Sequence, residues 1–172
     1  AMPGGTELHL ASAGFHAVER LWGPDDEIVL TLPMCVRAER RYRGAVSLSR
    51  GPLVYSLRLG EDWRQIGGEL PHADWEVRPT TPWNYALALS PDAPEVSLRV
   101  GTVGERPFSP QGAPVELLVR GRRLPQWGLE CNSAGPVPES PARSAEPEET
   151  LTLIPYGCTN LRVTEFPVLA ED

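Results

Sequence analysis

Residues 45–59, with the sequence AVSLSRGPLVYSLRL, contain the clearest strand pattern of the chain. Apolar and polar residues alternate on both sides of Arg50-Gly51-Pro52, as expected of strands that bury one face. Proline has no backbone N–H to donate to a sheet, so Gly51-Pro52 is expected to mark a bend or the start of a strand. The stretch therefore predicts two strands joined by a turn.

The same alternation recurs along the chain, in residues 15–22, 27–33, 83–89, 96–100, 115–119, 151–154 and 161–166. The first two of these segments flank the turn sequence Gly23-Pro24-Asp25-Asp26 and predict a hairpin. No segment of ten or more residues shows sustained helical periodicity, and 19 prolines and 16 glycines favour many short elements. We expect an all-β fold, an antiparallel, jelly-roll-like β-sandwich of about a dozen short strands.

The length of 172 residues predicts one domain with a sizeable core. Residues 1–5 (AMPGG) are expected to be an expression remnant or disordered, and residues 6–169 a single β-sandwich domain. Residues 132–149 are rich in Pro, Ser, Ala and Glu and nearly free of large apolar residues, which predicts a mobile loop.

The charge and the cysteines narrow the classes of partner and cofactor. A net charge of −7 disfavours nucleic acid and anionic membranes as partners, and no run of about 18 apolar residues predicts a membrane span. Cys35, Cys131 and Cys158 are odd in number and widely spaced, which favours reduced and mostly buried thiols over a disulfide framework or a zinc site. We expect no metal and no cofactor.

Several sequence strings, taken in order, resemble the C-terminal β-sandwich region of glycoside hydrolase family 127, the β-L-arabinofuranosidase-like proteins. The strings are Arg20-Leu21-Trp22 with Asp26 and Leu32-Pro33-Met34, then residues 50–55 (RGPLVY), 83–87 (WNYAL), 124–127 (LPQW) and 153–167 (LIPYGCTNLRVTEFP). They extend over nearly the whole chain, from about residue 14 to residue 168.

The resemblance implies a place downstream of the catalytic machinery. In that family an (α/α)6 barrel carries catalysis, with a zinc-bound cysteine nucleophile and a carboxylate acid, and sandwich domains follow it. Nothing in this chain matches the catalytic cysteine pair or the zinc ligands, and Cys158 does not take that role. We expect a non-catalytic accessory domain that packs on the barrel of its parent chain, shapes the rim of its site, or forms a dimer contact. The cytoplasm is the preferred location for the fragment, while secretion of the parent stays open.

An independent enzyme is the least favoured alternative. Glycoside hydrolysis usually needs two carboxyl groups about 5 to 9.5 Å apart, and most carboxylates here lie in acidic turns or in the 132–149 loop. Asp74 and Glu165 are the two worth inspecting. The histidines are scattered, and no serine or cysteine lies in a Gly-x-Ser-x-Gly string.

A carbohydrate-binding module is the stronger alternative, because indole faces stack on the apolar faces of sugars. Trp63 and Trp75 flank a polar, glycine-containing segment and are expected to be exposed, so they are the candidate sugar contacts, with Asp74 beside them. Trp83 and Tyr85 lie two residues apart and are expected to fill the core, whereas Trp22 and Trp127 are expected to close strand ends.

Overall fold

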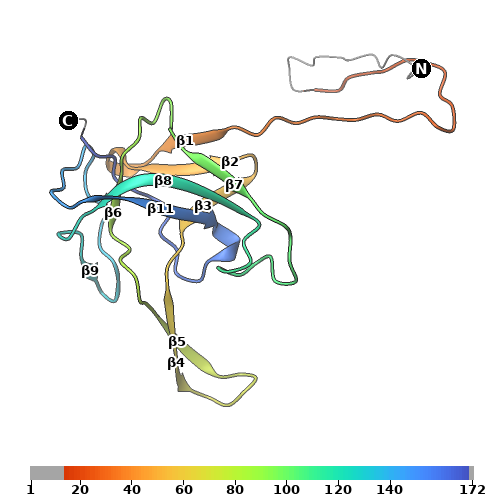
Figure 1. Cartoon of the computed structure of the whole chain (residues 1–172). Coiled ribbons are helices and arrows are strands. Elements are labelled where there is room, and N and C mark those ends of the chain that lie inside the picture. Colours follow the sequence, from red (N-terminus) through yellow and green to blue (C-terminus); the bar gives the residue numbers. More distant parts are fainter. Residues whose placement is uncertain (1–13, 171–172) are drawn as a thin grey trace. The chain divides into compact units, whose positions relative to one another are not determined.

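The computed structural model describes residues 14–170, which divide into two units after Pro33 (Figure 1). The first unit, Ala1–Pro33, contains neither strand nor helix over its described residues 14–33. Asp26 holds a local turn there: its carboxylate accepts hydrogen bonds from the Gly23 backbone N–H at 2.7 Å and from Arg20 at 2.8 Å. The predicted strands at 15–22 and 27–33 are therefore wrong as a hairpin within this chain, because neither segment has a pairing partner in the described part.

The second unit, Met34–Asp172, is antiparallel β-structure with two short 3-10 helices. Its elements are β1 (Val36–Arg40), η1 (Tyr42–Gly44), β2 (Val46–Arg50), β3 (Leu53–Leu57), β4 (Glu61–Gly67), β5 (Asp74–Pro79), β6 (Tyr85–Leu87), β7 (Ser97–Val100), β8 (Val115–Arg123), β9 (Leu129–Glu130), β10 (Ser133–Ala134), β11 (Glu148–Pro155) and η2 (Tyr156–Cys158). The predicted all-β, antiparallel fold class is confirmed.

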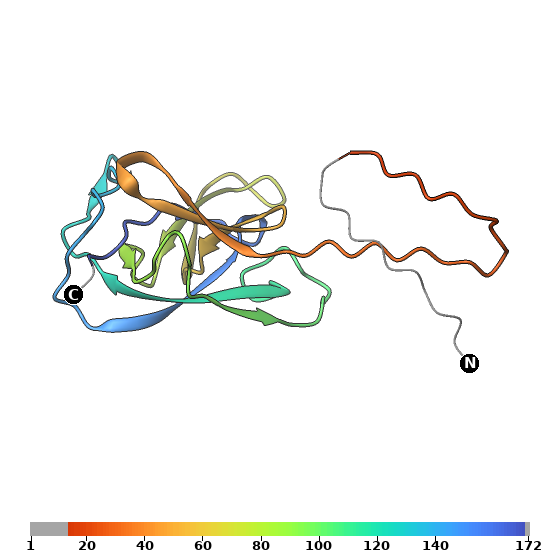
Figure 2. The ribbon, with the colours of Figure 1, turned by 90° about the horizontal axis from the view of Figure 1, so that it is seen from above.

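Seven strands form one antiparallel sheet in the order β1-β2-β3-β11-β8-β6, with β7 also pairing with β8. The two remaining sheets are hairpins, β4–β5 and β9–β10. Seen from above, the large sheet curls, so that β1 and β2 lie across from β8 and β11 (Figure 2). Such curling lets one sheet supply both walls of a core.

The C-terminal segment closes the gap between the two ends of the curled sheet. Val46 of β2 and Phe166 exchange backbone hydrogen bonds of 2.8 and 2.9 Å. Leu87 of β6 donates to Pro167 at 2.8 Å and accepts from Leu169 at 2.9 Å. Residues 166–169 therefore act as a seam between β2 and β6, although they form only isolated bridges rather than the strand predicted at 161–166.

The core consists of the alternate residues that the strands turn inward. Its largest cluster joins β2, β3, β6, β8 and β11 to the seam and contains Val46, Leu48, Tyr55, Leu57, Leu59, Tyr85, Leu87, Leu117, Val119, Leu151, Leu153 and Phe166. In β8 and β11 the facing pairs Val119–Leu151 and Leu117–Leu153 are both buried. The period of two in the sequence therefore reports the inner face of this sheet.

A second cluster lies where β6 meets the turn at residues 124–127 and contains Ala86, Leu124, Trp127 and Ala142. Trp83 packs against both clusters and meets Trp127 edge-to-face, with ring centroids 5.1 Å apart. Tyr85 and Trp127 are buried and Trp83 is half-buried, in agreement with their expected core roles.

The alternation in the sequence located five strands, β2, β3, β7, β8 and β11, together with the short β6. It missed β1, β4 and β5, most of whose residues are exposed, and the two-residue strands β9 and β10. The folded body also begins at Val36, so the sheets occupy less of the chain than the expected range 6–169.

Part of the segment predicted as a mobile loop, 132–149, is anchored to the body. Ala142 is buried and pairs with the seam, its N–H donating to Val168 at 2.7 Å. The buried indole of Trp127 donates to the Gly135 carbonyl at 2.9 Å, and β10 lies within the same segment. Small residues such as Ala142 and Gly135 allow close packing here. Composition alone does not distinguish such a packed segment from a flexible one.

The cysteines are unpaired among the described residues, and they differ in exposure. Cys158 is buried, whereas Cys35 and Cys131 are exposed, so the expectation of mostly buried thiols is wrong for two of the three. Within residues 14–170 no helix is long and apolar enough to cross a membrane.

Candidate functional site

The β4–β5 hairpin is the part of the second unit that extends furthest from its core (Figure 1). Its antiparallel register pairs Glu61 with Pro79, Trp63 with Val77 and Gln65 with Trp75. Directly opposed residues share a face of a hairpin, so these six side chains belong to one face. The other face carries two pairs of opposed charges, Asp62 with Arg78 and Arg64 with Glu76.

The connection between the two strands depends on a glycine. Gly68 has a φ of +69°, and a Cβ there would approach the His72 carbonyl oxygen at 2.8 Å. Gln65 reaches into this connection and donates to the Gly68 carbonyl at 2.8 Å, next to an irregularity in the register between Gln65 and Gly67. The glycine-containing segment that the sequence placed between the tryptophans is therefore a tight reversal that brings them together.

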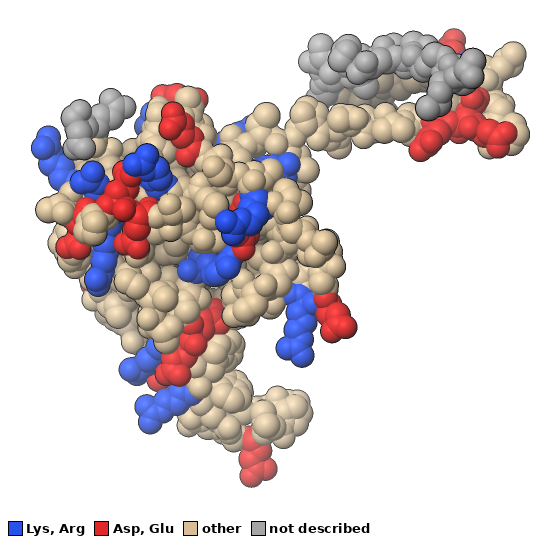
Figure 3. All heavy atoms as spheres, in the orientation of Figure 1, with Lys and Arg blue, Asp and Glu red and all other residues tan. Residues whose placement is uncertain are grey.

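Trp63 and Trp75 are diagonal neighbours on the hairpin face. Their ring centroids lie 6.2 Å apart with an interplanar angle of 70°, so the two indoles form a corner rather than one flat platform. Trp63 is 48% exposed and Trp75 is 44% exposed, which confirms the predicted exposure. Ile66 and Leu70 are also exposed in this hairpin, and residues other than Lys, Arg, Asp and Glu make up most of its far end (Figure 3).

A carboxylate and an amide lie beside the indoles. Glu61 Oε2 accepts hydrogen bonds from the Trp63 indole N–H at 3.0 Å and from Asn160 Nδ2 at 2.9 Å. Within the described part of the chain no hydrogen bond to Glu61 Oε1 occurs, so this oxygen can accept from an added hydroxyl. Sequence reasoning missed both residues, because Asn160 is 99 positions away from Glu61.

Asp74 does not join this group. Side chains alternate along β5, so Asp74 belongs to the face opposite Trp75, and it lies over Gly67, where an added Cβ would meet Asp74 Oδ2 at 3.2 Å. The expected grouping of Asp74 with the two tryptophans is therefore wrong, and Glu61 is the carboxylate on their face. Adjacent residues of a strand point to opposite faces, so the grouping fails because residues 74–79 form a strand that was not predicted.

The charged face of the hairpin is internally paired. Arg78 donates to Glu76 at 3.0 Å, and this hydrogen bond holds the pKa of Glu76 below its usual value and raises the pKa of Arg78. Exposed pairs of this kind contribute little to stability. Their effect is to keep one side of the hairpin hydrophilic, whereas on the indole side Glu61 is the one charged residue among the six paired positions.

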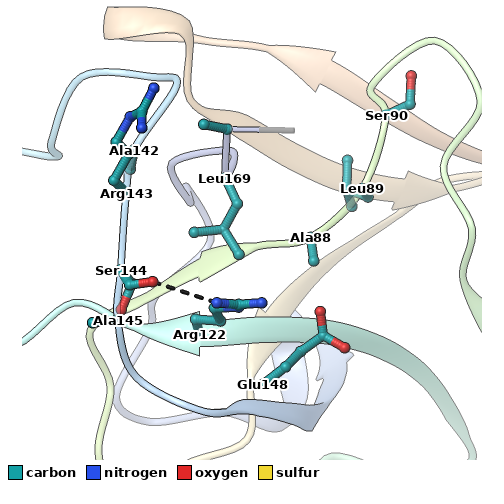
Figure 4. A pocket seen from close by; sticks show the side chains of 11 residues that line it. Ala88, Leu89, Ser90, Arg122, Ala142, Arg143, Ser144, Ala145, Glu148 and Leu169 are labelled. Atoms are coloured by element: carbon teal, nitrogen blue, oxygen red, sulfur yellow. Dashed lines mark hydrogen bonds between the residues drawn. The ribbon is translucent and has the colours of Figure 1, made fainter. Parts of the chain in front are cut away.

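A hollow of the second unit lies elsewhere, between β6, β8 and residues 142–145 (Figure 4). It has a volume of about 870 Å³ and is lined by Ala88, Leu89, Ser90, Arg122, Ala142, Arg143, Ser144, Ala145, Glu148, Leu169 and Ala170. Arg122 donates to the Ser144 carbonyl at 3.5 Å, and Glu148 forms an ion pair with Arg120. Glu148 is the single carboxylate among the described lining residues and is already paired, so residues 14–170 do not supply this hollow with the two convergent carboxyl groups that hydrolysis of a glycoside usually requires.

A second hollow, of about 430 Å³, lies between the base of the hairpin and β9 and is lined by Trp83, Asn84, Arg123 and Trp127 among others. Asn84 is buried and donates to the carbonyls of Leu124 at 2.8 Å and Trp127 at 3.0 Å. Its amide oxygen accepts from Arg123 at 3.3 Å. These polar groups therefore hold the turn at 124–127.

The remaining candidates for chemistry do not converge. Asp74 lies in the hairpin and Glu165 next to the seam, so the two carboxylates selected from the sequence belong to different parts of the fold. Over residues 14–170 no group of three or more His, Cys, Asp or Glu side chains could hold a metal ion. Cys158 donates to the Pro107 carbonyl at 3.2 Å, and burial raises the pKa of its thiol, which opposes formation of a nucleophilic thiolate.

No family model, curated protein or solved structure matches this chain. The function is therefore argued from the residues of the chain.

Proposed function

We propose that this chain is a non-catalytic accessory domain of a glycoside hydrolase of the β-L-arabinofuranosidase-like kind, which packs on the (α/α)6 barrel of its parent. The observation that carries the proposal is the exposed apolar surface that Trp63 and Trp75 form together on one face of the β4–β5 hairpin. Contiguous exposed apolar surface with charged surroundings is typical of interaction sites. The proposed role for this surface is contact with the barrel.

The positions of the family-like strings support a scaffold role. Residues 50–55 build the β2–β3 turn, where a Cβ on Gly51 would meet the Met34 sulfur. Residues 83–87 and 124–127 supply the second cluster, and Phe166 supplies the seam. These strings of the second unit therefore coincide with turns and core contacts of the body, and none of them contributes paired carboxylates to a hollow.

The test uses a family 127 (α/α)6 barrel, purified without its sandwich domains, mixed with this chain. Calorimetry or sedimentation is expected to detect a one-to-one complex, which the substitution Trp75→Arg weakens at least tenfold. The matched control is Leu98→Arg, since Leu98 is also an exposed apolar residue of a strand, on β7. Absence of binding, or equal losses in both variants, would contradict the proposed contact.

Binding of a carbohydrate by the same hairpin face is the second candidate. It is favoured by the corner of the two indoles together with the Glu61–Asn160 pair, because stacking surfaces beside hydrogen-bonding groups are what a sugar ring requires. The corner geometry suits one sugar ring placed on one indole and against the edge of the other.

Affinity gel electrophoresis against plant and bacterial polysaccharides, including arabinose-rich ones, tests this candidate, with a released-sugar assay on the same samples. Retardation without sugar release is expected, and Trp63→Ala with Trp75→Ala should abolish it while the far-UV spectrum is unchanged. Asp74→Ala is the control, because Asp74 lies on the other face. Retardation that survives the double substitution would remove the indole site.

A further inference from the structure

The segment from Asp25 to Leu32 has the composition of a strand but no partner in the part of the chain that the structure describes. Its apolar residues are exposed: Ile28, Leu30 and Leu32 are each 66–70% exposed. Alternation places these three on one side and Val29 and Thr31 on the other. An exposed strand-forming run of this kind is normally stabilised by addition to an open sheet edge.

The same chain has an open sheet edge at β1. β1 forms its ladder with β2 and, across residues 14–170, with no other strand. The Arg41 N–H donates to the Ala45 carbonyl at 2.7 Å. The backbone groups of Arg41 therefore point toward the β2 side. By alternation, the N–H and C=O groups of Val36, Ala38 and Arg40 point outward from the sheet, available to a further strand.

The charges of the two segments are complementary. Asp25, Asp26 and Glu27 precede the apolar run, whereas Arg37, Arg40, Arg41 and Arg43 with the single acid Glu39 occupy β1 and the residues after it. The first group carries three negative charges and the second a net charge of +3. Met34 and Cys35 alone separate the 27–33 segment from β1, so residues 27–40 can form one continuous strand.

We infer that residues 27–40 are a homodimerisation strand, which pairs antiparallel with the same residues of a second copy across a two-fold axis near Met34. This register sets Leu32 opposite Val36 and Leu30 opposite Ala38. Val36 and Ala38 pack against the core cluster, and opposed residues share a face, so Leu30 and Leu32 extend the core face of the partner.

The same register pairs the acidic residues with the basic ones and tolerates a proline at position 33. It places Glu27 opposite Arg41 and Asp25 opposite Arg43, so each acidic end meets the basic end of the other copy. Backbone groups alternate in direction along a strand, so those of Pro33, Cys35 and Arg37 all point away from the second copy. The missing N–H of Pro33 therefore costs no hydrogen bond in this pairing. A slip of one residue would move Leu30 and Leu32 to the solvent face.

The test is the mass of the 172-residue chain in solution, from light scattering and sedimentation over a range of concentrations. A species of twice 18.8 kDa is expected. Leu30→Lys should raise the dissociation constant at least tenfold, and Ile66→Lys, which changes an equally exposed residue of the hairpin, should leave it unchanged. A monomer at about 100 μM, or a dimer indifferent to Leu30→Lys, would overturn the inference.

Cross-linking tests the register. In a Cys35→Ser, Cys131→Ser background, Met34→Cys should form an intermolecular disulfide under mild oxidation, because the two-fold places the two Cα atoms about 5.5 Å apart. Val103→Cys, at another exposed site, is the control and should form no intermolecular disulfide. Failure of Met34→Cys to cross-link would overturn this pairing. The inference does not rest on the proposed function, since barrel or sugar binding concerns a different segment and a different readout.

Discussion

Phe166 and Val46 exchange backbone hydrogen bonds of 2.8 and 2.9 Å, and both side chains are completely buried in the main cluster. Such an exchanged pair is the repeating unit of an antiparallel ladder. Here a single pair connects the C-terminal segment to β2, while Leu87 connects the same segment to β6. The closure of the curled sheet therefore depends on one short segment and its anchoring side chain.

Phe166→Ala should lower the free energy of unfolding by about 3–5 kcal/mol, because it removes a fully buried ring and leaves a cavity at the seam. Urea unfolding followed by near-UV circular dichroism measures the change. Phe108→Ala is the matched control, since Phe108 is 82% exposed, and it should shift the midpoint little. Equal effects of the two substitutions would contradict the seam as an anchor.

Asn84→Ala should cost about 2–4 kcal/mol, because two buried carbonyls, those of Leu124 and Trp127, lose their donor. The effect should include loosening of the 124–127 turn, seen as greater exposure of Trp127 in fluorescence. Asn160→Ala provides the comparison: its hydrogen bond to Glu61 is exposed, so less than about 1 kcal/mol is expected. A change below 1 kcal/mol for Asn84→Ala would show that water replaces the amide.

Tyr85 should make the fold sensitive to alkali. Burial, reinforced by the nearby Glu149 carboxylate, raises the pKa of Tyr85 from 10.0 to about 12. Below pH 10 the phenol is neutral in the folded and in the unfolded chain, so it does not change the free energy of unfolding. Between pH 10 and 12 only the unfolded chain releases the proton, so the free energy of unfolding falls as pH rises.

The loss assigned to Tyr85 should reach up to about 3 kcal/mol at pH 12, since each unit of pKa difference corresponds to about 1.4 kcal/mol. Tyr85→Phe should remove that part of the slope between pH 10 and 12, measured as midpoints of urea unfolding. Tyr42→Phe, at an exposed position, should retain the slope of the parent chain. Identical slopes in the parent chain and Tyr85→Phe would contradict the raised pKa.

The three cysteine thiols should react with a disulfide reagent at different rates. Cys35 and Cys131 are exposed and should react with a disulfide reagent within seconds to minutes at pH 8, whereas Cys158 is buried, its thiol pKa is raised by burial, and it should react only after unfolding. Counting released thiolate before and after denaturant measures the two classes. Rapid reaction of all three cysteines in the folded protein would contradict the packing around Cys158.

The inner face of the sheet could be predicted from the sequence because it is local information. In 45–59 the buried residues Val46, Leu48, Tyr55 and Leu57 appear at alternate positions, so the period of two identified β2 and β3 directly. The β4–β5 hairpin lacked this signal, since charged residues and tryptophans alternate there with both faces in solvent. Its tryptophans were recognisable as exposed, yet its strands were not.

Non-local relationships were out of reach of the sequence. The alternation of residues 27–33 predicted a strand, but alternation does not identify the neighbouring strand with which such a segment must pair. The seam pairs Val46 with Phe166 across 120 positions, and the Glu61–Asn160 contact spans 99. The opposite sides of Asp74 and Trp75 follow from alternation only once β5 is known to be a strand, which the sequence did not indicate.

Gly51 provides a test of a turn that the sequence did identify. Its φ is +56°, and a Cβ would come 2.5 Å from the sulfur and 3.0 Å from Cγ of Met34. Gly51→Ala should therefore cost about 1–2 kcal/mol, because the left-handed backbone strains an alanine and the methyl group displaces Met34. Combining it with Met34→Ala should recover the part due to the contact, while the backbone strain persists. Gly104→Ala, at a position with open space and no positive φ, should be nearly neutral, and a comparable loss at Gly104 would show that the cost at Gly51 is not specific to its turn.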